Sequence, residues 1–222
     1  EFRIVKVPSP RPNYYRNDPI SMKRFHFLRN KNLADTIAKI CNASATALGE
    51  STLVLVEELG QIKELMSRLT VPFTYIHSGE GEEDDAGEVL LEKMDLTKAL
   101  EEFNSGKVKV LIGTKCVSTG TNIYPTHNTI NWQGGSSEIM TKQGTIGRSV
   151  RKLENSKFKD KHKPKPYTKV FDFQITGDPN EMDLEPALKK LDEHLEKRIR
   201  WYKETTTQTT KNKQKSKKFW RN

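Results

Sequence analysis

Cysteine clusters and long apolar runs are both missing from this sequence of 222 residues. Its two cysteines, Cys41 and Cys116, form no CxxC pair and stand in no cluster with histidine. We therefore expect neither a zinc site nor a disulfide, which suits a reducing compartment. No apolar run approaches the roughly 20 residues that a membrane-spanning helix needs, so we expect no membrane contact.

The first residues lack an initiator methionine and a signal-peptide pattern, so we expect the chain to be an internal part of a longer protein. Prolines at positions 8, 10, 12 and 19 surround Tyr14 and Tyr15. Because proline restricts the backbone and cannot donate to a sheet, residues 1–19 are predicted to be an extended connector.

Positive charge is concentrated at the other end of the chain. The formal net charge is +9, and six basic residues lie after residue 205. Threonine, glutamine and lysine cannot bury a core, so residues 205–222 are predicted to be a disordered basic tail. Lys215, Lys217 and Lys218, with Phe219 and Trp220 available for stacking, suggest a sequence-independent nucleic-acid arm. A solubilising end is the alternative.

Carboxylates gather between Glu80 and Glu88, around two glycines. Such a cluster is compatible with a divalent metal ion, but no apolar strand directly precedes it. We therefore interpret it as a solvated loop and predict no metal ligands in this chain.

Apolar strands alternate with amphipathic helices through the middle of the chain. Strands are predicted at 53–56, 73–76, 108–112, 128–132 and 168–174, with helices between them, and Asn32 is a candidate N-cap for the first helix. This order predicts an α/β fold with a parallel sheet, helices on both faces, and functional loops at the carboxyl ends of the strands. Residues 176–204 then form a helical extension whose leucines, Ile199 and Tyr202 favour core packing over a partner site.

Arg148 and Arg151 stand three residues apart and therefore share one face of a predicted helix. Together their guanidinium groups can reach one polyanion, such as the terminal phosphates of a nucleotide. Upstream, a buried strand leads into residues 113–123, a loop rich in glycine and hydroxyl groups, and residues 52–57 form a second such strand.

These three segments, in this order, resemble motifs IV, V and VI of the second RecA-like domain of superfamily 2 helicases. The resemblance covers residues 20–175, and makes residues 1–19 an interdomain linker. Arg29-Asn30, the segment from Phe103 to Gly106, and residues 170–173 are most similar to phage recombination and branch-migration helicases and to restriction-type translocases. A DNA motor acting on forked or branched DNA is implied, in the cytoplasm of a bacterial or phage-infected cell.

By this resemblance, Arg148 and Arg151 would be arginine fingers that stabilise charge on the transferred γ-phosphoryl group of ATP. Other nucleotide contacts are implied for Gly120, Asn122, Gln143 and Gly147. Neither a GxxxxGK[ST] phosphate loop nor an acidic Mg²⁺ motif occurs in the sequence. We expect the first RecA-like domain to supply both, so this chain alone should not hydrolyse ATP.

Nucleic acid would cross the same carboxyl-end surface, held mainly by its phosphates. Hydroxyl, backbone and charge contacts are predicted for six residues: Ser78, Gly79, Thr114, Lys115, Ser136 and Ser137. For Ser78 and Ser136 an ordinary turn position is an equal alternative. Two rival functions stay open, namely a non-catalytic nucleic-acid-binding RecA-like module and a free-standing phosphate-ester enzyme, although the latter lacks an identifiable nucleophile or base.

Overall fold

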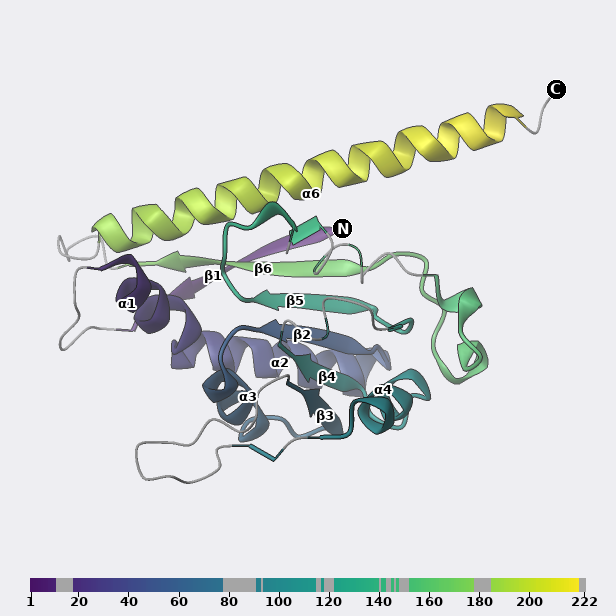
Figure 1. Ribbon diagram of the computed structural model, residues 1–222, viewed down its shortest axis with the longest axis horizontal. Helices are drawn as coiled ribbons and strands as arrows, with labels where there is room; N and C mark the ends of the chain where they lie inside the picture. Colours follow the sequence, from purple (N-terminus) through teal and green to yellow (C-terminus); the bar gives the residue numbers. More distant parts are fainter. Residues whose placement is uncertain are drawn as a thin grey trace.

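The computed structural model arranges six strands in one sheet, shown in Figure 1. The sheet order is β1-β6-β5-β2-β4-β3, and every neighbouring pair is parallel. The strands are β1 (Phe2–Pro8), β2 (Thr52–Val56), β3 (Phe73–Ile76), β4 (Val110–Gly113), β5 (Asn128–Trp132) and β6 (Lys169–Thr176). All strands therefore present their carboxyl ends at the same edge.

The structure describes residues 1–10, 18–77, 91–92, 94–114, 117, 122–139, 141–142, 145, 147, 152–177 and 185–219. Within the last range it describes side chains from 188 to 205. The acidic cluster at 80–88 lies outside these residues.

Helices cover both faces of the sheet, as the alternation of elements predicts. α2 (Lys31–Leu48) and α3 (Leu59–Met66) pack on one face, against Val54, Ile112 and Phe173. α4 (Leu96–Asn104) packs on the other face, and α6 (Glu185–Phe219) crosses β6 on that face. A short α1 (Pro19–Lys23) continues into a π-helical turn at Arg24–Leu28. No helix in the described part of the chain has the length and apolar composition of a membrane span.

Side-chain alternation along the central strands divides the core into two layers. Val54 and Val56 of β2 face α2 and α3, whereas Leu53 and Leu55 face α4, and all four are fully buried. Strands that are buried on both faces are continuous apolar runs in sequence. This explains why the strand predicted at 53–56 agrees with β2.

The N-terminal segment corrects one prediction. Residues 2–8, expected in an extended linker, form the edge strand β1, which pairs with β6 from Phe2↔Val170 to Pro8↔Thr176. Val7 is 1 % exposed and belongs to the core. The first proline, Pro8, is the last residue of this strand. Its missing N–H group therefore disturbs the hydrogen bonds between β1 and β6 very little.

The C-terminal segment corrects another. α6 runs from Glu185 to Phe219, so the segment predicted to be disordered from residue 205 continues the helix. No glycine or proline follows Pro186 to end it.

The N-cap of α2 is Asn30 rather than the predicted Asn32, because the Asn30 side chain accepts from the backbone N–H groups of Asn32 and Leu33.

Candidate functional site

A polar cleft of about 380 Å³ lies at the carboxyl ends of β2 and β5. Strand β5 supplies Asn131, and the loop that follows it supplies most of the remaining wall. The lining residues are Lys23, Glu57, Asn131, Gln133, Gly135, Ser136, Ser137, Thr141 and Thr145. The cleft therefore occupies the edge at which ligands of parallel α/β sheets commonly bind.

Two glutamines fix the backbone where β2 and β5 end. Gln133 Nε2 donates to the carbonyl of Val56 at 3.1 Å, and Gln61 Nε2 donates to the carbonyl of Trp132 at 2.8 Å. The Gln61 Oε1 atom also accepts the N–H groups of Glu57 and Glu58. Since both glutamines are buried, these bonds hold the two strand ends together in a low-dielectric environment.

Gly134 carries the loop after β5 across an aromatic ring. Its φ of +62° lies in the left-handed region, and a Cβ atom there would stand 2.7 Å from the Phe27 ring. Phe27 is 1 % exposed, and its carbonyl accepts from Trp132 Nε1 at 3.2 Å. Only glycine fits this approach without displacing the ring.

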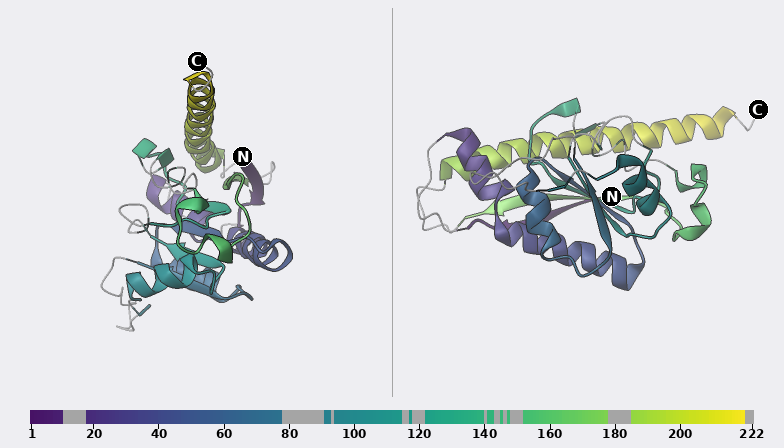
Figure 2. Two further views of the ribbon diagram at one scale, coloured as in Figure 1. Left: turned by 90° about the vertical axis from the view of Figure 1, so that its right-hand side faces the viewer. Right: turned by 60° about the horizontal axis from the view of Figure 1, so that its bottom comes forward.

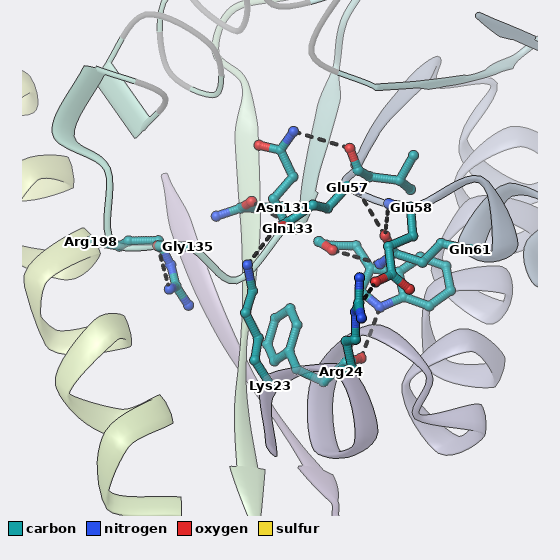
Figure 3. Close-up of polar contacts among 12 residues, drawn as sticks. Lys23, Arg24, Glu57, Glu58, Gln61, Asn131, Gln133, Gly135 and Arg198 are labelled. Atoms are coloured by element: carbon teal, nitrogen blue, oxygen red, sulfur yellow. Dashed lines mark hydrogen bonds and ion pairs between the residues drawn. The ribbon is translucent and has the colours of Figure 1, made fainter. Parts of the chain in front are cut away.

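Ion pairs join the rim of the cleft to α1 and the π-helical turn, as Figure 3 shows. Lys23 pairs with Glu57, and Arg24 Nε lies 2.7 Å from the Glu58 carboxylate. Arg29 reaches the same carboxylate at 3.2 Å. Glu58 thus holds two arginines beside a second cleft of about 400 Å³, lined by Arg24, Arg29 and Lys31 among others.

A buried network on α6 forms the floor beneath the loop after β5. Arg198, which is 2 % exposed, donates from Nε and Nη2 to the two oxygens of Asp172, at 2.7 and 2.9 Å. Tyr202 and Asn131 also donate to Asp172. The remaining Arg198 contact, from Nη1, goes to the carbonyl of Gly135 at 2.9 Å (Figure 3). Burial acts to lower the pKa of Arg198, but the Asp172 carboxylate outweighs it and raises that pKa.

A second contact links α6 to the segment that leads toward Gly147. Lys142 Nζ bridges Glu138 at 2.6 Å and Glu204 of α6 at 3.1 Å. Thr141 N–H and its hydroxyl both bond to the carbonyl of Ser137, as in a first helical turn. α6 therefore braces both the loop after β5 and the segment that follows it.

The residues that line the cleft offer mainly hydrogen-bonding groups. Its wall combines hydroxyl groups and amides with one charge-balanced pair, Lys23 and Glu57. The described residues include no group of three or more His, Cys, Asp or Glu side chains placed to hold a metal ion. Such a surface suits a ligand that offers many oxygen acceptors, for example a phosphodiester backbone.

The structure brings together some of the residues predicted from the sequence. Ser136 and Ser137 line the cleft. Gly147 lies close to Lys142, because a Cβ atom added at Gly147 would stand 3.3 Å from the Lys142 carbonyl oxygen. Thr114 directly follows β4 but is only 8 % exposed, and its N–H donates to the carbonyl of Ile76. The others lie outside the described residues or, for the tail lysines, outside the described side chains: Ser78, Gly79, Lys115, Gly120, Gln143, Arg148, Arg151, Lys215, Lys217 and Lys218.

Asn122 does not join this group. Its carbonyl accepts from Asn104 Nδ2 at 2.9 Å, and Asn104 is the last residue of α4, next to the amino end of β4. The connection from β4 to β5 has therefore already crossed to the amino edge of the sheet by residue 122. The resemblance implies a nucleotide contact for Asn122, whereas the structure places this residue beside α4.

Sequence reasoning missed the network around Asp172, although two signals could have revealed it. Asp172 interrupts the apolar run of β6, where a carboxylate needs a buried partner. Arg198 follows Leu191 and Leu195 and precedes Tyr202 at helical spacing, so it occupies an apolar position of the α6 stripe. An acid and a base, each in a buried position, predict an ion pair between strand and helix.

Comparison with known proteins gives one family match. Residues 33–152 match the model described as the helicase conserved C-terminal domain. No curated protein sequence matches the chain. Among solved structures, S. cerevisiae Dbp5 bound to RNA and ADP BeF3 is 16% identical, with a TM-score of 0.44, over 72% of this chain and 36% of that one.

Two further solved structures are similar to this chain. T4 UvsW is 20% identical, with a TM-score of 0.48, over 77% of this chain and 32% of that one. The Pyrococcus furiosus Hef helicase domain is 12% identical, with a TM-score of 0.40, over 67% of this chain and 26% of that one. The chain thus spans about a third or less of these two proteins.

Proposed function

Because the chain belongs to the family of the helicase conserved C-terminal domain, we propose that it is the second RecA-like domain of an ATP-dependent DNA helicase or translocase that remodels forked or branched DNA. The family match carries this proposal. The parallel sheet, with a polar cleft at its carboxyl edge, supports it because motors of this kind bind their ligands at that edge.

In this proposal the ATP side of the domain is formed by the segment around Gly147. Arg148 and Arg151 would neutralise charge that develops on the γ-phosphoryl group, and Gly120 and Gln143 would contribute further nucleotide contacts. The first RecA-like domain of the same protein would contribute the phosphate loop and hold Mg²⁺. Hydrolysis then requires closure of the two domains, which couples chemistry to movement along DNA.

The nucleic-acid side would be the cleft itself. Ser136 and Ser137 lie on its wall, and their loop is held from below by the Arg198 contact to Gly135. A loop held in place gives phosphate donors at low entropic cost on binding. Ser78, Gly79, Thr114 and Lys115 would extend this track along neighbouring strand ends.

ATP turnover by the longer natural protein tests the proposal. We expect Arg148→Ala to lower kcat by about 10³-fold to 10⁵-fold, with forked DNA binding largely retained. Arg200→Ala is the matched control, since Arg200 is an exposed arginine on α6, and it should leave turnover unchanged. The chain of 222 residues alone should show no turnover.

Other outcomes would select the rival functions. If Arg148→Ala and the wild type hydrolyse ATP equally, the arginine-finger role is wrong. If neither hydrolyses ATP but both bind DNA, the domain is a non-catalytic binding module. A preference for RNA over forked DNA of the same sequence would overturn the DNA assignment.

A further inference from the structure

The connection that enters β6 carries a dense group of lysines at the amino edge of the sheet, opposite the cleft. Between residues 152 and 169 the sequence has seven lysines and two carboxylates, Glu154 and Asp160. The lysines are Lys152, Lys157, Lys159, Lys161, Lys163, Lys165 and Lys169. We call residues 152–169 the lysine loop; neither the ATP side nor the cleft involves it.

The lysine loop has a defined shape because two buried histidines hold its backbone. His127 Nε2 donates to the carbonyl of Lys163 at 2.9 Å, while its Nδ1 accepts from the N–H of Ser51. His162 Nε2 donates to the carbonyl of Asn104 at 2.6 Å. Burial lowers the pKa of both histidines, which favours the neutral ring that His127 needs to accept the Ser51 N–H at Nδ1.

Most of the charge on the loop is not neutralised. Lys152, Lys159 and Lys161 are exposed and form no ion pair with any described residue. Lys157 approaches Glu101 only to 3.9 Å, and both side chains are more than half exposed, so that pair contributes little. Lys169 differs, because its bond to Glu50 at 2.9 Å is largely buried.

The basic end of α6 projects from the same edge of the sheet. In Figure 1 the yellow end of the helix and the lysine loop both extend beyond the amino ends of the strands, on the right of the view. Both also point toward the viewer in the left panel of Figure 2. Among the side chains of α6 that the structure describes, the last buried one is Tyr202, and the helix continues for 17 residues, or about 25 Å, to Phe219. Six lysines stand in that extension.

Two basic segments far apart in sequence therefore reach the same side of the molecule. We propose that the lysine loop, together with the basic end of α6, binds the phosphate backbone of double-stranded nucleic acid at the amino edge of the sheet. The ligand is a polyanion because exposed lysines recur at every second residue from Lys157 to Lys163, which suits repeated phosphates rather than one anion.

Duplex nucleic acid fits this surface better than a single strand or a protein. A single strand needs aromatic platforms for its bases, yet the loop offers only Tyr167, which is 54 % exposed, and Phe158, over which Lys157 already lies at 4.8 Å. Protein interfaces have an apolar centre and are depleted in lysine. Lysine-rich, weakly apolar surfaces are instead typical of contacts to a phosphate backbone.

This inference rests on the proposed function only in taking nucleic acid as the ligand, since the surface lies opposite the cleft. The lysine loop would give the motor a second binding site, for the double-stranded part of the nucleic acid before strand separation or after re-pairing. Such a hold changes affinity without changing the ATP site.

The test measures binding of a fluorescent DNA duplex, and of one of its strands, to this chain at several salt concentrations. The loop variant is Lys157→Gln, Lys159→Gln and Lys161→Gln. The matched control is Lys39→Gln, Lys63→Gln and Lys98→Gln, which removes the same charge from exposed lysines on α2, α3 and α4. Circular dichroism and the thermal midpoint verify that both variants fold.

For the loop variant we expect duplex affinity to fall about tenfold or more, and the slope of log K against log salt to become shallower by about 2 to 3. Single-strand affinity should change less. A further variant, Lys215→Gln, Lys217→Gln and Lys218→Gln, should weaken duplex binding in the same direction.

Equal duplex affinity and salt slope in the loop variant and the control would overturn the inference, as would an equal loss of single-strand binding. The two proposals fail separately. Unchanged duplex binding with an Arg148→Ala loss of turnover rejects only the second surface. Weakened duplex binding with normal turnover in Arg148→Ala rejects only the arginine fingers.

Discussion

Removal of the buried guanidinium of Arg198 should destabilise the whole domain. Arg198→Met leaves the Asp172 carboxylate, which is 0 % exposed, with Tyr202 and Asn131 as donors but no compensating cation. Removing one partner of a buried ion pair lowers the free energy of unfolding by about 3–5 kcal/mol. Domains of this size are stable by about 5–15 kcal/mol, so the variant would lose a large part of its free energy of unfolding.

The measurement is thermal unfolding of the chain, followed by circular dichroism and by the fluorescence of the fully buried Trp132. With about 2–4 °C of thermal midpoint per kcal/mol in a protein of this length, the expected midpoint shift is roughly 6 to 20 °C. Lys197→Met is the matched control, since Lys197 is an exposed residue on the same helix.

A double variant separates the ion pair from simple packing. Arg198→Met with Asp172→Leu removes both charges and leaves Tyr202 and Asn131 hydrogen-bonded to each other, at 3.3 Å in the present structure. Because no unpaired charge stays buried, the double variant should be more stable than Arg198→Met alone. The reasoning is refuted if Arg198→Met resembles Lys197→Met, or if the double variant loses the sum of the two single effects.

Two further predictions concern single residues. Gly134→Ala should lower the free energy of unfolding by about 1–3 kcal/mol, because φ is +62° and the added Cβ would meet the Phe27 ring. The control is Gly135→Ala, which should be near neutral in the same denaturation assay because its Cβ would have nothing within 4 Å. Equal effects of the two substitutions would contradict the close approach of Gly134 to the ring. Burial lowers the pKa of Lys165 to about 8 in the folded protein, whereas lysine in the unfolded chain has a pKa of about 10.4. Between these pH values the unfolded chain binds more protons than the folded protein does. The free energy of unfolding should therefore rise with pH from about 8 to about 10.4. Lys165→Met should remove that rise and add about 1–3 kcal/mol of stability at pH 7; a variant that keeps the same pH dependence above pH 8 would show that another group is responsible.

The central strands and the helices between them could be predicted because each is defined by its own local pattern. Residues 53–56, 73–76 and 128–132 are short runs rich in β-branched, apolar or aromatic residues between polar turns, and the structure confirms strands there. Parallel order followed from the alternation with helices. Such signals lie within about ten residues of one another and need no knowledge of distant contacts.

Features that depend on distant partners were missed. β1 contains the strand-forming residues Ile4, Val5 and Val7, but its pairing partner β6 lies 168 residues away in the sequence. The position of Asn122 beside the end of α4 could not be predicted, because residue types do not give the direction of the chain within a long connection. Ser136 and Ser137 were expected at the carboxyl ends of the strands, and they line the cleft there. The loop that carries them is held by Arg198, whose ion pair with Asp172 forms only when strand and helix meet.

The pairing of β1 with β6 also has a consequence for the order of folding. β1 has its only neighbour in the sheet in β6, so its hydrogen bonds wait until the polypeptide has been synthesised as far as residue 176. Pairing between strands this far apart in sequence forms slowly, because the entropy of closing a long loop is lost before any stabilising contact is made. We expect the block β5-β2-β4-β3 to form first on the ribosome, with β1 an unpaired and aggregation-prone edge until the last strand emerges.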